Sequence, residues 1–158
     1  MKFLVTKSLR DVPLLRYLML FITLFIVLFL LTDIAMHHTQ IGLTLEKVTS
    51  TLYGNEERFE EPILIGSLLL QVHIDWFFSM LIVLTLLAIY IRFYEKRKTT
   101  KIWIHLFSFL GIFSPLLLLL SFFIKSKMMV LGWISMFALW HLLAFYLGFK
   151  IMIKLIKL

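Results

Sequence analysis

The chain of 158 residues contains no cysteine, and it has only 3 prolines and 6 glycines. The lack of cysteine excludes disulfide bonds, thiolate metal ligands, iron–sulfur clusters and the covalent attachment of a c-type haem. The sequence also lacks HExxH, GxSxG and a phosphate-binding glycine loop, which mark common hydrolases and transferases. No hydrolase or transferase activity is therefore indicated, and a redox role would depend on a cofactor held by other side chains.

Charged residues are scarce, at 16% of the chain, whereas hydrophobic residues make up 61% and the mean hydropathy is +0.99. A soluble globular protein averages about 45–50% apolar residues. Here the apolar residues form long blocks that short charged connections separate, which is typical of membrane proteins. The composition therefore predicts an all-α integral membrane protein.

Four apolar blocks reach the roughly 20 residues that a helix needs to cross a bilayer. Each must be helical, because an unpaired backbone polar group in lipid costs several kcal/mol. No small-residue cleavage site follows the first block, so we expect it to remain as a span. We predict one membrane domain over residues 1–158, folded as an up-down-up-down four-helix bundle. Its spans cover residues 14–35, 65–91, 102–124 and 128–149, and its outer loop covers residues 36–64.

The basic residues predict the orientation of this bundle. Twelve of the 16 Lys and Arg residues lie in the N-terminal leader, in the connection 92–101 and in the C-terminal tail. Cytoplasmic loops carry such a surplus, so both termini are expected on the cytoplasmic side of the inner membrane. The net charge of +7 is then a topology signal that also attracts anionic lipid heads, and no nucleic-acid partner is indicated.

The outer loop contains a second helical pattern. Apolar residues recur there at helical spacing at Ile41, Leu45, Val48 and Leu52. Thr44 is a suitable N-cap and Gly54 a suitable end for this segment. We expect a short amphipathic helix that lies on the outer membrane interface.

Ionisable residues inside the spans are the candidates for function, since each costs at least about 2.5 kcal/mol at the bilayer centre. A rise of 1.5 Å per residue places them in two layers of depth. The outer layer holds Asp33, His37, His38, His73 and Asp75, and the inner layer holds His105 and His141.

The helical period predicts how these side chains point. Asp33 and His37 are four residues apart, so they share one face of the first helix. His73 and Asp75 are about 200° apart around the second helix and cannot both face the same neighbour. We expect His73 to face the bundle centre. Asp75 would then be capped by Gln71 and Ser79, or would face another chain.

The first functional hypothesis is a non-covalent b-type haem for electron transfer. Such a haem lies between bundle helices with two histidines as axial ligands. His37 or His38 with His73 is one candidate pair, His105 with His141 is a second, and His73 with His141 is a third. The candidate cofactor-binding residues are therefore His37, His73, His105 and His141.

The second hypothesis is a metal or proton site. Asp33, His37 and His73 offer the mixed oxygen and nitrogen ligands that suit Cu(II), Zn or non-haem Fe. The same residues are also able to relay protons, because histidine titrates near neutral pH.

The third hypothesis, from a different class, is a cofactor-free accessory or assembly subunit of a larger membrane complex. His105 would then be an interfacial residue, and His141 would hydrogen-bond across helices for structural reasons. The expected partners are the lipid bilayer and other membrane subunits. The working hypothesis is an integral cytoplasmic-membrane protein with a buried His/Asp site.

Overall fold

The computed structural model describes residues 12–94 and 98–157. This part of the chain is helical, with four long helices, a shorter helix and one 3-10 turn. They are α2 (Pro13–Gln40), α3 (Leu45–Tyr53), η2 (Glu56–Arg58), α4 (Ile65–Tyr94), α5 (Lys98–Ile124) and α6 (Lys127–Ile156). The basic leader and residues 95–97 of the basic connection lie outside the described residues.

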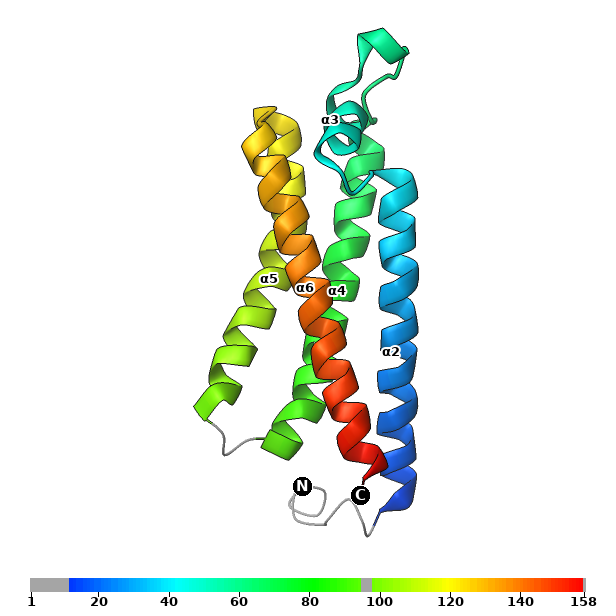
Figure 1. Cartoon of the computed structure of the whole chain (residues 1–158), viewed down its shortest axis with the longest axis vertical. Helices are drawn as coiled ribbons and strands as arrows, with labels where there is room; N and C mark the ends of the chain where they lie inside the picture. The colour runs from blue at the N-terminus through cyan, green and yellow to red at the C-terminus, as the bar shows by residue number, and fades with distance from the viewer. Residues whose placement is uncertain (1–11, 95–97, 158) are drawn as a thin grey trace.

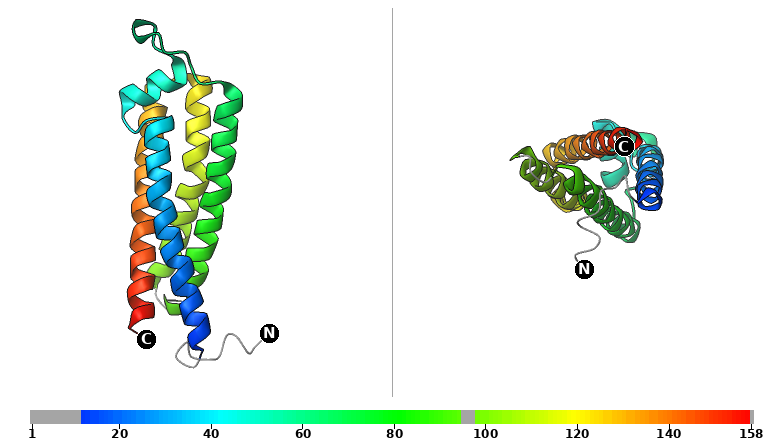
Figure 2. Two further views of the ribbon diagram at one scale, coloured as in Figure 1. Left: turned by 90° about the vertical axis from the view of Figure 1, so that its right-hand side faces the viewer. Right: turned by 90° about the horizontal axis from the view of Figure 1, so that it is seen from below.

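The four long helices lie side by side, with α3 at one end of the bundle (Figure 1). α2 begins and α6 ends at the opposite end. α6 packs against both α2 and α5, and α4 packs mainly against α5 (Figure 2). α2 and α4 contact each other sparingly. Among the helix pairs named here, α2 and α4 are therefore the most loosely packed.

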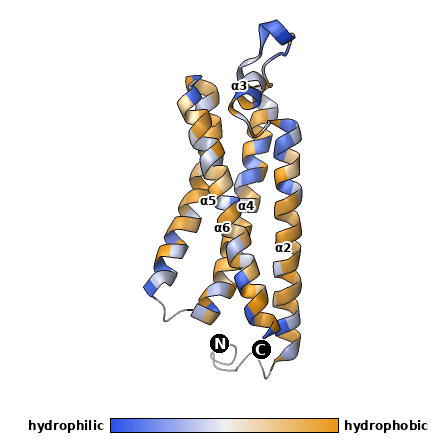
Figure 3. Ribbon diagram, in the orientation of Figure 1, coloured by the Kyte–Doolittle hydropathy of each residue, from blue (hydrophilic) through white to orange (hydrophobic). Residues whose placement is uncertain are grey.

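All four long helices are long and apolar enough to cross a membrane, which confirms the prediction of four long apolar helices. Figure 3 shows hydrophobic residues along their length and hydrophilic residues around α3 and η2. Apolar side chains also cover the outside, where Phe25 is 64% exposed and Leu84 is 69% exposed. An exposed apolar surface of this extent is consistent with contact to lipid.

The helices extend beyond the predicted spans at several ends. α2 continues to Gln40, α5 already begins at Lys98, and α6 continues to Ile156. Polar and basic residues at these ends lie beyond the apolar blocks but do not interrupt a helix. A basic residue such as Lys154 in the last turn even favours the helix, because it complements the negative end of the helix dipole.

Two apolar clusters fill the bundle. The cluster nearest α3 includes Ile41, Val48, Leu52, Leu68, Leu118, Val130 and Trp133. The cluster farther from α3 includes Leu30, Leu86, Tyr90, Phe107, Leu147 and Ile151. The His37 ring contacts Phe137 of the first cluster, and the His141 ring makes an edge contact with Trp140 of the second. The polar residues described below therefore lie where the two clusters meet.

A proline inside α5 shapes the contact between α4 and α5. Pro115 has no backbone N–H, so the carbonyl of Gly111 loses its usual helical donor. The Ser79 hydroxyl of α4 donates to this carbonyl at 3.0 Å, and the Trp76 indole donates to the adjacent Ile112 carbonyl at 2.9 Å. A neighbouring helix thus supplies the hydrogen bond that the proline removes, as a membrane interior requires.

α3 has the ends that the sequence predicted. The Thr44 side chain accepts a hydrogen bond from the Lys47 backbone, and Gly54 ends the helix with a φ of +82°. Val48 and Leu52 are fully buried against the end of the bundle, and Tyr53 donates to the Ser121 carbonyl of α5 at 2.8 Å. The apolar face of α3 therefore covers the bundle, while its place at a membrane interface stays a prediction.

Glu60 fastens the outer loop to α3. Its carboxylate accepts hydrogen bonds from the Ser50 hydroxyl and, at 3.3 Å, from the Lys47 ammonium. These hydrogen bonds, that of Ser50 above all, hold the pKa of Glu60 below its ordinary value. The stabilisation that the Glu60 carboxylate contributes is therefore complete above its ordinary pKa. It is lost as the pH falls through the lowered pKa.

We predict that Ser79→Ala lowers the free energy of unfolding by about 1 kcal/mol, because it leaves the Gly111 carbonyl without a donor. In a Pro115→Ala background the cost should shrink, since residue 115 then supplies its own N–H. Denaturant unfolding in detergent micelles measures both values. Ser135→Ala is the control, because that exposed hydroxyl donates only to its own helix. An equal cost of Ser79→Ala in both backgrounds would contradict this explanation.

Candidate functional site

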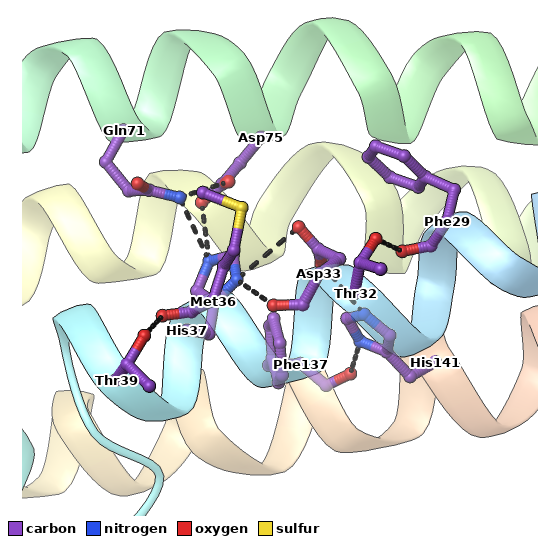
Figure 4. A network of polar contacts seen from close by, with 10 residues as sticks. All are labelled: Phe29, Thr32, Asp33, Met36, His37, Thr39, Gln71, Asp75, Phe137 and His141. Atoms are coloured by element: carbon purple, nitrogen blue, oxygen red, sulfur yellow. Dashed lines mark hydrogen bonds and ion pairs between the residues drawn. The ribbon is translucent and has the colours of Figure 1, made fainter.

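Three helices bring four ionisable side chains together. Asp33 and His37 lie one turn apart on α2, Asp75 faces them from α4, and His141 faces them from α6 (Figure 4). His37 and His141 are 1% and 3% exposed, and the side chains of Asp33 and Asp75 are 19% and 11% exposed. We call these four residues the His/Asp cluster.

Both histidines are held by the backbone of their own helix. Nδ1 of His37 lies 3.0 Å from the Asp33 carbonyl, and Nδ1 of His141 lies 2.9 Å from the Phe137 carbonyl. A carbonyl oxygen only accepts hydrogen bonds, so Nδ1 carries the proton in each ring. This arrangement fixes the tautomer and turns Nε2 of each histidine toward a neighbouring helix.

Each Nε2 atom faces a carboxylate oxygen. Nε2 of His37 lies 3.1 Å from Oδ2 of Asp75, and Nε2 of His141 lies 3.0 Å from Oδ2 of Asp33. In a neutral ring with Nδ1 protonated, Nε2 has a lone pair and accepts. Two acceptors repel each other at this distance, so each contact needs a proton or a metal cation between its atoms.

Gln71 completes the network on α4. Its amide donates to Oδ1 of Asp75 at 2.7 Å, and the same nitrogen lies 3.3 Å from Nε2 of His37. Nδ1 of His37 also lies 3.5 Å from Oδ1 of Asp33. The polar contacts therefore run without interruption from α4 through α2 to α6 (Figure 4). The predicted cap of Asp75 by Gln71 is confirmed, whereas Ser79 donates to α5 instead.

The negative charges of the two aspartates must be balanced within this site. An ionised carboxylate at the centre of a membrane costs at least about 2.5 kcal/mol on the insertion scale. The side chains that pair with them are His37, His141 and Gln71, which are neutral unless a histidine gains a proton. Two protons neutralise the cluster and fill both His–Asp contacts. One divalent metal ion at Asp33, His37 and Asp75 balances the same charge and fills the contact between His37 and Asp75.

The geometry of Asp33, His37 and Asp75 suits a metal ion. Each offers one ligand atom, and these atoms lie within 4.8 Å of one another. Ligands about 2.1 Å from one ion lie roughly 3.0–3.4 Å apart when they are adjacent in octahedral or tetrahedral geometry. The 3.1 Å between His37 and Asp75 already falls in this range.

His73 does not belong to the cluster, so the expectation that it faces the bundle centre was wrong. It is exposed and lines a groove on the outer surface together with Trp76 and Leu84. Asp75 points inward instead, because it shares a stripe with Gln71 and Ser79 and this polar stripe packs toward the neighbouring helices. The opposite stripe of α4 is almost entirely apolar and faces outward.

The predicted separation into two layers of depth was also wrong. His141 contacts Asp33 of the supposed outer layer, while His105 is exposed on α5. α6 extends seven residues past the predicted end at residue 149, which moves His141 about 10 Å farther from that end. The histidines of two predicted haem-ligand pairs do not face each other, which applies to His37 with His73 and to His105 with His141.

Comparisons with known proteins do not identify a relative. No family model matches the chain, and neither a curated protein nor a solved structure matches it significantly. The function is therefore argued from the geometry of the site.

We predict that Asp33 and His141 stabilise the fold together. In the presence of a metal chelator, the double-mutant cycle of Asp33→Ala and His141→Ala should give a coupling energy of about 1–3 kcal/mol, since the residues are in direct contact. Denaturant unfolding in detergent measures the four variants.

A second cycle is the control, and it pairs Asp33→Ala with His105→Ala. Its coupling should be close to zero, because His105 is exposed on another helix. Equal coupling in the two cycles would mean that the contact between Asp33 and His141 contributes nothing specific.

Proposed function

We propose that the chain is a single-domain, multi-pass protein of the cytoplasmic membrane, with its four long helices crossing in alternating directions and both termini in the cytoplasm. The length and apolar surface of the helices support this proposal. Arg16 near the start of α2 and Lys154 in the last turn of α6 are basic, and both helix ends lie at the same end of the bundle. α3 then covers the outer end.

We further propose that the protein binds one divalent transition-metal ion through Asp33, His37 and Asp75, with His141 supporting the site through Asp33. The observation that carries this proposal is the Nε2 atom of His37, which faces a carboxylate oxygen of Asp75 at 3.1 Å with Asp33 beside it. Both rings are held by Nδ1 to a backbone carbonyl, which is the usual support of a metal-binding histidine.

The ligand types select the class of metal. Two carboxylates balance a charge of 2+, and mixed oxygen and nitrogen ligands suit Zn²⁺, Mn²⁺ or Fe²⁺. A cysteine-free chain offers no thiolate, which is the ligand that favours Cu(I). The three protein ligands leave room for a further ligand, as in catalytic zinc sites.

A proton relay is the second candidate, and a separate observation favours it. The contacts from Asp75 through His37 and Asp33 to His141 form one unbroken chain of hydrogen-bonding groups. In this form each imidazole carries the extra proton, and the same carboxylates are balanced without a metal. Metal content separates this candidate from the first.

The cluster does not fit a haem. The cavity beside it has a volume of about 30 Å³, which is far smaller than a porphyrin. His73 and His105, two of the four histidines considered for haem, lie on the outer surface. The exposed apolar faces still support the accessory-subunit hypothesis. That hypothesis predicts that the purified protein contains no metal.

We predict that the detergent-purified protein, stripped with a chelator and reloaded with Zn²⁺, retains about one ion per chain. His37→Ala and Asp75→Asn should each weaken Zn²⁺ binding by at least tenfold, because each removes a ligand. Mass spectrometry of metals after dialysis measures the occupancy.

The chain offers matched controls for both variants. His38→Ala changes the exposed neighbour of His37, and His73→Ala changes the exposed histidine two residues before Asp75. Both should retain wild-type occupancy. Zn²⁺ binding that is absent, or equally weak in His37→Ala and His38→Ala, would refute the metal site and favour the proton relay.

A further inference from the structure

A small cavity adjoins the His/Asp cluster. It has a volume of about 30 Å³ and is lined by the four residues of the cluster and by Gly111 and Trp140, among others. A buried water needs roughly 10–15 Å³ on this measure, so the cavity has room for a ligand of about two to three non-hydrogen atoms, or for two to three waters. It is too small for an organic substrate of ordinary size.

One residue that lines this cavity, Trp140, carries an unpaired donor. Trp140 is 5% exposed. Among the side chains of residues 12–94 and 98–157, its Nε1 is the buried nitrogen or oxygen atom that has no hydrogen-bond partner. The ring is fixed by stacking on Phe107 and by an edge contact with His141. A buried N–H without an acceptor is unfavourable and rare, so it indicates a bound acceptor.

Gly111, which also lines the cavity, lies close to this N–H. A Cβ atom at position 111 would lie 3.0 Å from Nε1 of Trp140 and 3.2 Å from the side chains of Met80 and Val83. A side chain at this position would therefore press on the indole nitrogen and reduce the cavity. The glycine is required here for close approach.

We infer that this cavity binds one small ligand at the open position of the metal. The ligand is water or hydroxide, or a small anion that replaces it, and it accepts a hydrogen bond from Trp140. This inference rests on the proposed metal site. Such a ligand satisfies both the indole N–H and the position that three protein ligands leave open. The protein would then bind small inorganic ligands at the metal rather than enclose the ion completely.

The test uses the full chain in detergent, loaded with Co²⁺ and titrated with azide, while the visible absorption of the cobalt is recorded. The wild-type spectrum should change with azide. Trp140→Phe keeps the ring but removes the donor, so it should weaken azide binding by about tenfold. Gly111→Ala keeps the Trp140 donor but presses on the indole and reduces the cavity, and it should also weaken azide binding.

Trp103→Phe is the matched control, because Trp103 stacks on Tyr146 away from this cavity, and it should bind azide as the wild type does. Cobalt stoichiometry and helical content are measured for every variant, so that a folding defect is recognised. If Trp140→Phe does not fold, Gly111→Ala decides the test. Bound cobalt with azide affinity unchanged in both cavity variants, or no azide effect at all, would overturn this inference alone. Failure to bind cobalt would overturn the metal site and this inference with it.

Discussion

The structure depends on the neutralisation of two partly buried carboxylates. Asp33 and Asp75 lie among four apolar helices, where neither charge is tolerated alone. The two histidines that face them present Nε2 lone pairs, so the cluster holds together only when protons or a metal ion add two positive charges. α2 and α4 pack sparingly elsewhere, so this polar contact is also a main connection between them.

The rest of the fold isolates this cluster. One apolar cluster lies on each side of it, and α3 covers the end of the bundle above Trp133. The proline in α5 frees a carbonyl that Ser79 satisfies, which ties α4 to α5 one turn beyond Asp75. In such a dry environment each electrostatic interaction is stronger than in water, and an unpaired charge is correspondingly more costly.

Much of the fold was predictable because apolar blocks and their charged connections are local signals. The helical spans, α3 and its Thr44 and Gly54 ends followed from spacing and residue type alone. The site was predictable only in part, since Asp33 and His37 share a face but their partners lie on other helices. Choosing between His73 and Asp75 needed the packing of α4, and placing His141 needed the true end of α6. The polar stripe of Gln71, Asp75 and Ser79 was the signal that would have identified the inner face.

X-ray absorption at the zinc edge of the reloaded protein tests the central claim most directly, because it reports the atoms around the ion. The account predicts a shell of oxygen and nitrogen ligands at about 2.0–2.2 Å, with the outer scattering of at least one imidazole. A hydrated ion without imidazole scattering would contradict it, since the charge that balances Asp33 and Asp75 would then not be a metal bound by His37.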